Sequence, residues 1–505
     1  MEESIIRMVE QAKRIADIIA SSDGIRIISH FDCDGIASAS IISKALIRLK
    51  KRFHVSLVKQ LDAEKIEELS SEPSACFIFL DIGSGQLDAI AAHLKGKTVI
   101  IADHHQLQSD AQYENISHLN PLLFGIEENI SGAGMSYIIA RAIDRLNRDL
   151  SQIAIVGAIG DAQIGSIGKE WGLLGLNREI LKDAVAEGKI KVGKGIRLFG
   201  RYTRPVHKAL EYCIEPYIPG ISGSESAAVH FLHEAGIEIA RNDGSFRTLA
   251  DLSVEEQQRL ADHIIVERIA GKVTDAEWIF GDVYELFDKK DIRDANEFAT
   301  MLNACGKLEK AYIGIALCLS EEAEEAAKDI MEEYRRRLGK AMRYVEGEKS
   351  VRETEAAYYL VAGERIPENL IANVASIAGR SIFTGKPLFA FAKTENGKIK
   401  VSARLPNGNQ INLREIVSRA ASAVGGEGGG HMAASGATIP SDSEEKFIDI
   451  VEEMLKNAFK HKIDDRPEGK NDGNAAEENR AAIEEERNDG KNRLEGKGLV
   501  HYFGS

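Results

Sequence analysis

The chain has 505 residues, which suggests roughly two to four domains, and its 44% apolar and 28% charged residues are ordinary for a soluble globular protein. A formal net charge of −15 excludes a basic field over the whole surface, so local cations or metal ions would have to meet any anionic ligand. Five cysteines without a C-x-x-C pair argue against a disulfide framework and a zinc ribbon, and no long apolar run predicts a membrane helix, so we expect a cytoplasmic protein.

The first 215 residues alternate apolar segments with amphipathic patterns. Apolar residues at helical spacing predict a helix over residues 3–20. The strands expected after it cover residues 25–29, 54–59, 75–80 and 98–102, and the helices between them cover residues 36–50, 62–70 and 85–95. Because strands that alternate with helices favour a mostly parallel sheet covered on both faces, we expect an α/β domain here.

Acidic and imidazole side chains follow four apolar segments of this domain. They are His30, Asp32 and Asp34 after the first strand, Asp81 after the third, Asp103, His104 and His105 after the fourth, and Asp161 after the apolar run 153–160. Periodicity leaves open whether that last run is a buried helix or a buried strand. Because open α/β sheets place their chemistry at the carboxyl ends of their strands, we expect these side chains to converge in one cleft.

Such a cluster of carboxylates predicts bound divalent cations. Unpaired acids would raise one another's pKa, whereas carboxylates with a few imidazoles and no thiolate suit Mn²⁺ or Mg²⁺. Two cations about 4 Å apart that share one carboxylate can activate a water and stabilise a displaced phosphoryl oxygen, and Asp81 is the expected bridge. His30, Asp32 and Asp34 are expected to bind the cation on the first side, and His104 and Asp161 the cation on the second side. His105 is expected to contact the phosphate, and Asp103 to orient an imidazole. Each motif alone also fits an ordinary surface or a satisfied polar network, but the four together favour the metal site.

Two further stretches allow a contact with phosphate. Ser131 to Gly134 precede a helix expected at 134–147, and small residues at a helix N-terminus can approach a phosphate, although a tight turn is an equally good interpretation. Phe199 to Pro205 combine two arginines with two aromatic residues. That cluster could follow a nucleic-acid backbone or lie in a solvated linker.

The remaining chain divides by composition into a helical stretch, a second α/β pattern and a polar tail. In the helical stretch, helical patterning covers residues 225–235, 253–271, 293–304 and 319–343. In the second α/β pattern, the expected strands cover residues 356–362, 387–393 and 398–404. The expected helices of that pattern cover residues 367–378, 411–424 and 443–460. Five glycines within residues 425–430 precede His431, and their backbone N–H groups could contact an anion or simply form a flexible loop. After Lys462 the composition predicts disorder, ending in Leu499-Val500-His501-Tyr502-Phe503, which is either a short docking peptide or an end without a role.

The motifs resemble a known superfamily. His30 to Gly35, Asp81, Asp103 to His105 and Gly160-Asp161 look like motifs I to IV of the DHH phosphoesterases, and Gly428 to His431 with Ala433 to Gly436 resembles the glycine-rich signature of the associated DHHA1 domain. With Phe199 to Pro205 and Pro216 to Gly220, the chain is most similar to archaeal RecJ-like single-strand exonucleases. The resemblance implies a DHH domain over residues 1–215, a helical insert or connector over 216–350, a smaller α/β DHHA1 domain over 351–462 and a disordered tail over 463–505.

The resemblance also implies an activity. A Mn²⁺- or Mg²⁺-dependent nuclease would remove mononucleotides from the ends of single-stranded DNA or RNA, in DNA replication or repair. Its cleft would lie between the DHH and DHHA1 domains, and the residues expected to hold the strand are Arg404, Gly429, Gly430 and His431, with Arg380 as a weaker candidate. His30 stands where bacterial RecJ proteins often begin the motif with Asp, which keeps a ligand in place.

Partners and alternative functions follow from the same resemblance. Similar proteins associate with the GINS replication complex, and the final residues resemble a box that binds the sliding clamp PCNA, through Leu499, Tyr502 and Phe503, without the usual first Gln. One alternative function is a replication scaffold that shares the DHH fold. The other is a phosphodiesterase of short oligoribonucleotides or cyclic dinucleotides, which similar DHH-DHHA1 proteins perform.

Overall fold

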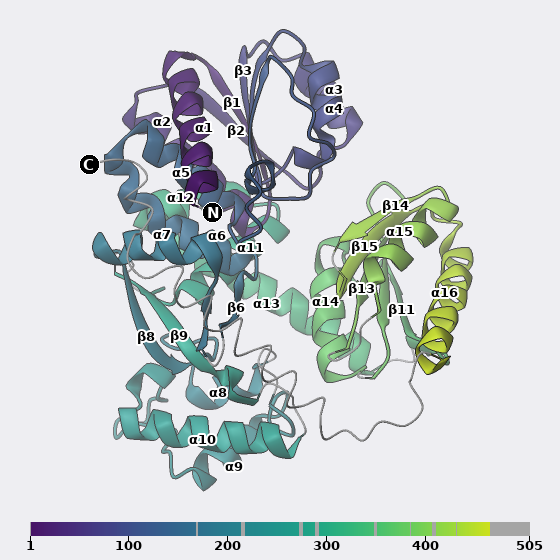
Figure 1. The fold of residues 1–505 in the computed structure, drawn as a ribbon. Coiled ribbons are helices and arrows are strands. Elements are labelled where there is room, and N and C mark those ends of the chain that lie inside the picture. The colour runs from purple at the N-terminus through teal and green to yellow at the C-terminus, as the bar shows by residue number, and fades with distance from the viewer. Residues whose placement is uncertain are drawn as a thin grey trace. The chain divides into compact units, whose positions relative to one another are not determined.

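The computed structural model describes residues 2–464 apart from 168–169, 214–217, 272–275, 288–291, 348–350, 384, 407–410 and 431. The chain divides into a first unit up to Met331 and a second unit from Glu332 (Figure 1). Each unit has its own sheet and its own hydrophobic core. The predicted α/β class, with a parallel sheet in the N-terminal region and a smaller α/β region later in the chain, is therefore confirmed.

A five-stranded parallel sheet forms the centre of the first unit. Its strands are β1 (Ile25–His30), β2 (Phe53–Val58), β3 (Cys76–Leu80), β4 (Thr98–Ala102) and β5 (Ile116–Leu119). Their spatial order is β2-β1-β3-β4-β5, so the chain leaves β1 toward one side and returns to its other side at β3. This change of direction lies at the carboxyl ends of β1 and β3, which is the region where open α/β sheets bind their ligands and which we refer to as the crevice.

Helices cover both faces of this sheet (Figure 1). Helices α1 (Glu2–Ser21), α2 (Cys33–Arg48) and α5 (Gly132–Ile143) pack together on one face, and α3 (Ala63–Ser70) and α4 (Leu87–His93) lie on the other. Because side chains alternate along a strand, Phe77 and Phe79 of β3 both face α3 and α4 and are fully buried there. Burial on both faces explains why β3 and β4 are almost continuously apolar.

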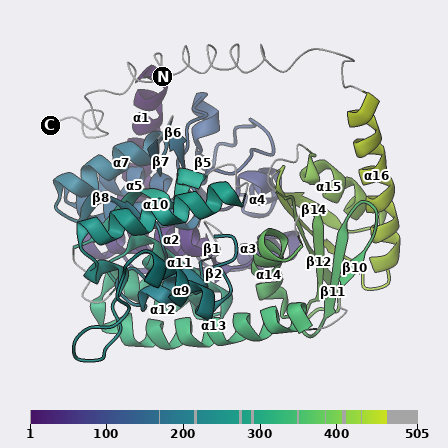
Figure 2. The same ribbon diagram turned by 90° about the horizontal axis from the view of Figure 1, so that it is seen from below.

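The rest of the first unit is mostly helical. It comprises α6 (Ser151–Gly160), β6 (Ile164–Ile167), β7 (Glu170–Leu173), α7 (Gly175–Ala186), β8 (Ile190–Ile196), α8 (Val206–Glu211), α9 (Glu225–Glu234), α10 (Val254–Ala270), β9 (Phe280–Leu286), α11 (Ala295–Lys307) and α12 (Ala311–Leu319). Strands β6 and β7 form one antiparallel pair and β8 and β9 another. Helices α8, α9 and α10 share a small hydrophobic core. Figure 2 shows the ribbon of α9 and α10 from below. Short 3₁₀ turns at Ser84–Gln86, Pro121–Phe124, Arg145–Leu150, Leu249–Asp251, Ala276–Ile279 and Glu321–Ala323 complete the unit.

A six-stranded mixed sheet forms the second unit, which α13 (Glu324–Gly347) connects to the first. The strands are β10 (Val351–Glu353), β11 (Tyr358–Gly363), β12 (Leu388–Lys393), β13 (Ile399–Arg404), β14 (Glu427–Gly430) and β15 (Ala434–Ile439), in the order β10-β11-β12-β13-β15-β14. Helices α15 (Leu413–Ala423) and α16 (Glu444–Asp464) pack on one face, and α14 (Glu368–Ser381) contacts β12 and β13.

The structure decides or corrects several expectations. The apolar run at 153–160 is a helix, α6, so Asp161 follows a helix and not a strand end. The expected helical stretch 220–350 also contains a strand, β9, whose partner β8 lies about 90 residues earlier in the chain. Four of the glycine-run residues form the edge strand β14 in place of a flexible loop. The predicted disordered tail lies outside the described residues.

The five cysteines are all buried, and none of them forms a disulfide bond. Among the described residues, no helix is both long enough and apolar enough to cross a membrane.

A buried carboxyl group on α11 should make stability depend on pH. Burial, reinforced by the charge of Asp294, raises the pKa of Glu297 to about 7 from an ordinary value of 4.5, although Thr203 donates a hydrogen bond to its carboxylate. Between these two pH values the folded chain holds a proton that the unfolded chain has released, so the free energy of unfolding should fall as the pH rises through this window.

The variant Glu297→Gln should therefore be more stable than the parent at pH 8, by up to about 3 kcal/mol, and nearly equal to it at pH 5. Urea unfolding of the metal-free proteins at the two pH values measures the difference. Glu321→Gln, at an exposed position, is the matched control. A stability difference between Glu297→Gln and the parent that is the same at both pH values would contradict this interpretation.

Candidate metal centre

The turn after β1 supplies three of the candidate residues. His30 is the last residue of β1, and Asp32 is the N-cap of α2, where its carboxylate accepts a hydrogen bond from the Gly35 amide at 3.1 Å. The Nδ1 atom of His30 lies 2.9 Å from the other carboxylate oxygen of Asp32. The α2 N-terminus thus fixes Asp32 in a position where it meets the imidazole, since a capping carboxylate satisfies an otherwise unpaired amide.

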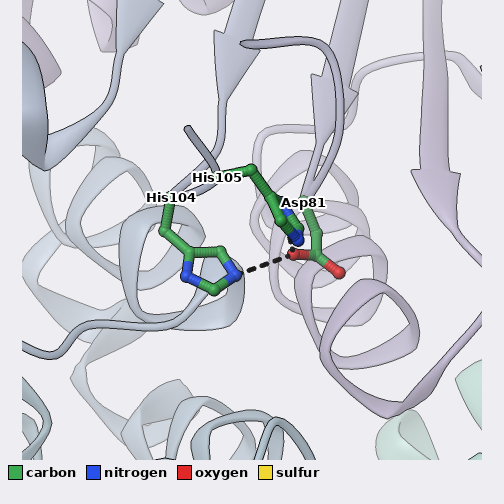
Figure 3. Close-up of side chains that lie close together, drawn as sticks. All are labelled: Asp81, His104 and His105. Atoms are coloured by element: carbon green, nitrogen blue, oxygen red, sulfur yellow. Dashed lines mark ion pairs between the residues drawn. The ribbon is translucent and has the colours of Figure 1, made fainter. Parts of the chain in front are cut away.

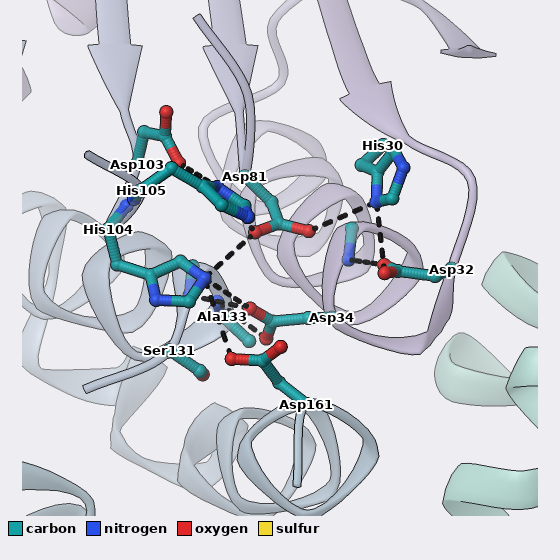
Figure 4. A network of polar contacts seen from close by, with 12 residues as sticks. His30, Asp32, Asp34, Asp81, Asp103, His104, His105, Ser131, Ala133 and Asp161 are labelled. Atoms are coloured by element: carbon teal, nitrogen blue, oxygen red, sulfur yellow. Dashed lines mark hydrogen bonds and ion pairs between the residues drawn. The ribbon is translucent and has the colours of Figure 1, made fainter. Parts of the chain in front are cut away.

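Asp81 lies at the centre of the cluster (Figure 4). It follows β3, its side chain is 2% exposed, and its backbone φ of 56° is in the left-handed region, which Asp adopts more readily than most residues. One carboxylate oxygen, Oδ2, lies 3.7 Å from His30 Nδ1, and the other, Oδ1, lies 3.3 Å from His104 Nε2. A single buried carboxylate therefore contacts groups on both sides of the crevice.

The N-terminus of α5 binds the carboxylate of Asp34. The amides of Gly132 and Ala133 donate to its two oxygens at 2.6 and 3.0 Å. A Cβ on Gly132 would lie 2.7 Å from the Asp81 carboxylate, so only glycine fits between the two acids. The helix N-terminus considered for phosphate is thus buried against a protein carboxylate, and the phosphate interpretation of Ser131 to Gly134 is wrong for these two amides.

His104 and Asp161 complete the opposite side. Asp161 is the C-cap residue of α6, and its carboxylate oxygen lies 3.5 Å from His104 Nε2. The same nitrogen lies 3.7 Å from Asp34. Gln163 donates a hydrogen bond to Asp161 at 2.8 Å, which orients that carboxylate toward His104.

Asp103 holds His105 through a buried network. One Asp103 oxygen accepts from the backbone amides of His104 and His105 and contacts His105 Nδ1 at 2.7 Å, while the other oxygen accepts from the Ser84 amide at 2.9 Å. Asn120 donates to the Ser84 hydroxyl and to the His105 carbonyl, both at 2.9 Å. These bonds fix the ring of His105 and leave its Nε2 atom for another ligand.

The pKa shifts of the cluster reflect burial and the negative charge of the neighbouring carboxylates. Burial, together with the charges of Asp81 and Asp161, raises the pKa of Asp34 well above its usual range, and burial also raises the pKa of Asp161. Burial alone would lower the pKa of His104, but the neighbouring carboxylates outweigh it and raise the pKa to about 10. The pKa of His30 is raised in the same way by Asp32 and Asp81. Positive charge is therefore strongly favoured between these carboxylates.

The donor atoms fit divalent cations. Asp81 Oδ1 and His104 Nε2 lie 3.3 Å apart as an ion pair (Figure 3). Both atoms are buried and make no hydrogen bond within the described part of the chain, which is costly unless another ligand satisfies them. Three groups each place their ligand atoms within 4.8 Å of one another: His30 with Asp32 and Asp81, Asp34 with His104 and Asp161, and Asp81 with His104 and His105. Carboxylates with imidazoles and no exposed thiolate suit Mn²⁺ or Mg²⁺. All six predicted ligands are close enough to share two such sites. Their role as ligands stays a prediction.

The residues expected to hold nucleic acid lie in the second unit. Arg404 and Gly430 are at the same end of its sheet, because Ser435 of β15 pairs with both Ala403 and Gly430. The guanidinium of Arg404 donates to Ser376 Oγ at 2.7 Å and to the Ala403 carbonyl at 2.8 Å, and burial together with the charge of Arg380 lowers its pKa to about 10. These bonds tie Arg404 to its own unit.

Arg380, Gly429 and His431 are the other residues expected to contact the nucleic-acid strand. Arg380 is exposed in the last turn of α14, and Gly429 is half-buried in β14. His431 lies outside the described residues.

The arginines of the Phe199 to Pro205 stretch also have partners within the protein. Arg204 packs over the rings of Phe199 and Tyr212, with its guanidinium carbon 4.6 and 5.3 Å from the ring centroids, and Arg201 donates to Gln257 at 3.1 Å. This favours a structural role for the stretch over a strand-binding one.

Sequence reasoning missed several residues that orient the cluster. They are Ser84, Asn120, Gln163 and, on α11, Asn303. Gln163 follows Asp161 by two residues, and this proximity is a signal that could have identified it. The others are polar residues in loops or helices whose spacing shows no pattern, so only the tertiary structure reveals them.

Three family models match the chain over separate ranges. They are the DHH family N-terminal domain over residues 24–160, the DHH-CID domain over residues 198–278 and the DHHA1 domain over residues 356–457. An uncharacterized protein of Methanocaldococcus jannaschii is 33% identical over 470 residues, which cover 90% of this chain and 99% of that protein.

The single-stranded-DNA-specific exonuclease RecJ of Thermus thermophilus is 24% identical over 216 residues, which cover 40% of this chain and 31% of RecJ. The structure of that RecJ with Mn²⁺ matches 89% of this chain with a TM-score of 0.54, and this chain spans 55% of the RecJ chain. CDC45 from Entamoeba histolytica matches 90% of this chain and 98% of its own with a TM-score of 0.61 at 11% identity, which shows a shared fold.

The family models cover the first parallel sheet with its acidic crevice, the small helical core and the sheet of the second unit. Together with the relative that matches along nearly its whole length, they show that this chain belongs to the DHH phosphoesterase superfamily and has the RecJ-like combination of DHH and DHHA1 domains.

Proposed function

We propose that this chain is a two-cation phosphodiesterase that removes mononucleotides from the ends of single-stranded DNA or RNA. The observation that carries the proposal is the buried Asp81 carboxylate, which forms ion pairs with His30 on one side and His104 on the other. Its Oδ1 atom makes no hydrogen bond among the residues that the structure describes. A carboxylate between two sets of ligands is what a bridging residue requires.

The proposed roles follow from the positions of the side chains. His30 and Asp32 would hold one cation and Asp34, His104 and Asp161 the other, with Asp81 shared. When bound, Mn²⁺ or Mg²⁺ would lower the pKa of a water and neutralise charge on the phosphoryl oxygens. His105 is held through Nδ1 by Asp103, and this hydrogen bond raises the pKa of the imidazole. In its protonated form the ring would donate a hydrogen bond from Nε2 to a phosphate oxygen and stabilise the charge that develops there.

The substrate class rests on the superfamily and on the likeness to RecJ, whose name states a single-stranded DNA substrate. A chain with a net charge of −15 would bind a polyanion only through the local positive charge of such a site. Arg404, Arg380, Gly429, Gly430 and His431 remain the proposed strand contacts.

A non-catalytic scaffold role in a GINS-type replication complex is the second candidate. It is favoured by the fold shared with CDC45, which this chain matches over 98% of that protein. The full set of site carboxylates and imidazoles in this chain favours the enzyme, because buried acids without cations would cost stability.

The test uses single-stranded DNA and RNA of one sequence, labelled separately at each end, with Mn²⁺, Mg²⁺ or chelator. We expect metal-dependent release of mononucleotides, and the label that disappears first gives the polarity. Faster hydrolysis of dinucleotides than of long strands would instead support the small-substrate phosphodiesterase. A folded protein that binds Mn²⁺ and cleaves none of these would support the scaffold.

The proposed clamp contact through Leu499, Tyr502 and Phe503 lies outside the described residues. Removing the chain from Leu494 onward should abolish binding to PCNA and leave nuclease activity unchanged. Unchanged clamp binding by the truncated protein would eliminate this contact.

A further inference from the structure

Helix α11 contacts the turn that carries Asp32 and Asp34. The backbone amide of Cys33 donates a hydrogen bond to Asn303 Oδ1 at 3.0 Å, across a sequence separation of 270 residues. Cys33 is fully buried and is the first residue of α2, so its amide belongs to the helix end that no intrahelical carbonyl can satisfy. The local cap Asp32 accepts from the Gly35 amide, and Asn303 accepts from the Cys33 amide.

A second contact lies three residues further along α11. A Cβ on Gly306 would lie 1.9 Å from the carbonyl oxygen of Phe31, so the backbone of α11 lies directly against the turn and no larger residue fits. Gly306 and Asn303 are at helical spacing and face the same side. Together they contact the backbone on both sides of Asp32, at the Phe31 carbonyl and at the Cys33 amide.

A third contact closes the other side of the turn. The thiol of Cys33 lies 3.5 Å from the carbonyl oxygen of Val156 in α6, the helix that ends at Asp161. The turn is therefore enclosed between α6 and α11. Asp32, the residue between the two held backbone atoms, has little freedom to change its direction.

We propose that Asn303 and Gly306 are positioning residues of the metal centre, which aim Asp32 and Asp34 at their cations through the backbone of the turn. The inference rests on the proposed function, because it requires that these acids bind metal. The hydrogen bond of Asn303 and the close approach of Gly306 are both to the backbone of the turn, and neither residue lies in the ranges that the three family models match. Residues that only orient metal ligands typically change metal affinity by about 10- to 100-fold when replaced.

The test is a calorimetric titration of the full metal-free chain with Mn²⁺ alone. Asn303→Leu keeps the size of the side chain and removes the acceptor, and it should weaken Mn²⁺ binding by about 10- to 100-fold. Asn303→Asp keeps an acceptor oxygen, and its affinity for Mn²⁺ should lie within about threefold of the parent's affinity. Thr300→Val is the matched control, since it removes a hydrogen bond from Thr300 Oγ1 to the Asn296 carbonyl within α11 itself and should leave the affinity unchanged.

Hydrogen exchange of the peptide that contains Cys33 gives a second readout that does not depend on metal. The Cys33 amide should exchange faster in Asn303→Leu than in the parent or in Thr300→Val. The three proteins are compared at a temperature at which all of them are folded. If Asn303→Leu binds Mn²⁺ like the parent, this inference is overturned and the proposed function stands. If the folded parent binds no Mn²⁺, the proposed function fails and this inference fails with it.

Discussion

Replacing Asp81 with asparagine should lower metal-dependent hydrolysis by more than about 100-fold, which is the upper range seen for residues that only orient a metal ligand. The reason is that Asp81 contacts both sides of the crevice, so the change removes the one carboxylate that both proposed cations would share. Asparagine keeps the size of the side chain and has no negative charge. Initial rates on labelled single strands, measured against Mn²⁺ concentration, give the effect.

The melting temperature of the metal-free protein should change little. Asp81 raises the pKa of Asp34 and Asp161 through repulsion, and it raises the pKa of His30 and His104 through attraction, so removing its charge relieves the first and weakens the second. We expect Asp81→Asn to melt close to the parent without metal, and to lose the increase in melting temperature that saturating Mn²⁺ gives the parent.

Asp110→Asn, at an exposed position, is the matched control and should behave like the parent in both measurements. Hydrolysis by Asp81→Asn at the parental rate would exclude Asp81 as the shared ligand. A lower melting temperature of the metal-free variant would show instead that Asp81 stabilises the fold.

Replacing His105 with asparagine should lower kcat by about 100- to 1,000-fold, the usual effect of removing one group that stabilises charge in the transition state. Mn²⁺ affinity should change little, because Asp103 occupies the Nδ1 atom of His105 and the other candidate ligands remain. His104→Asn should show the reverse pattern and weaken Mn²⁺ binding, since its Nε2 atom lies within 3.7 Å of three carboxylates.

Parallel calorimetry with Mn²⁺ and single-turnover rates at saturating Mn²⁺ separate the two effects. His93→Asn, an exchange at an exposed histidine of α4, is the matched control. If His105→Asn weakens Mn²⁺ binding as much as His104→Asn, then His105 is a metal ligand and the proposed phosphate contact is wrong.

The periodicity and composition of the sequence determined much of the local secondary structure of the first unit. The strands β1, β3 and β4 lie within one or two residues of their predicted bounds, because continuous apolar segments bounded by turns and acids are typical of buried parallel strands. The acids after them were also identified, since the carboxyl ends of parallel strands must share one edge of the sheet.

Only the tertiary structure decided how the cluster is assembled. The run before Asp161 is uniformly apolar, so its pattern has no period that distinguishes a buried helix from a buried strand. The amides that hold Asp34 come from α5, about 100 residues away, and the acceptor that holds the Cys33 amide comes from Asn303, 270 residues away. Such contacts depend on how helices pack against the sheet, which local sequence patterns do not encode. The sequence alone therefore predicted which acids meet, but not which helices hold them in place.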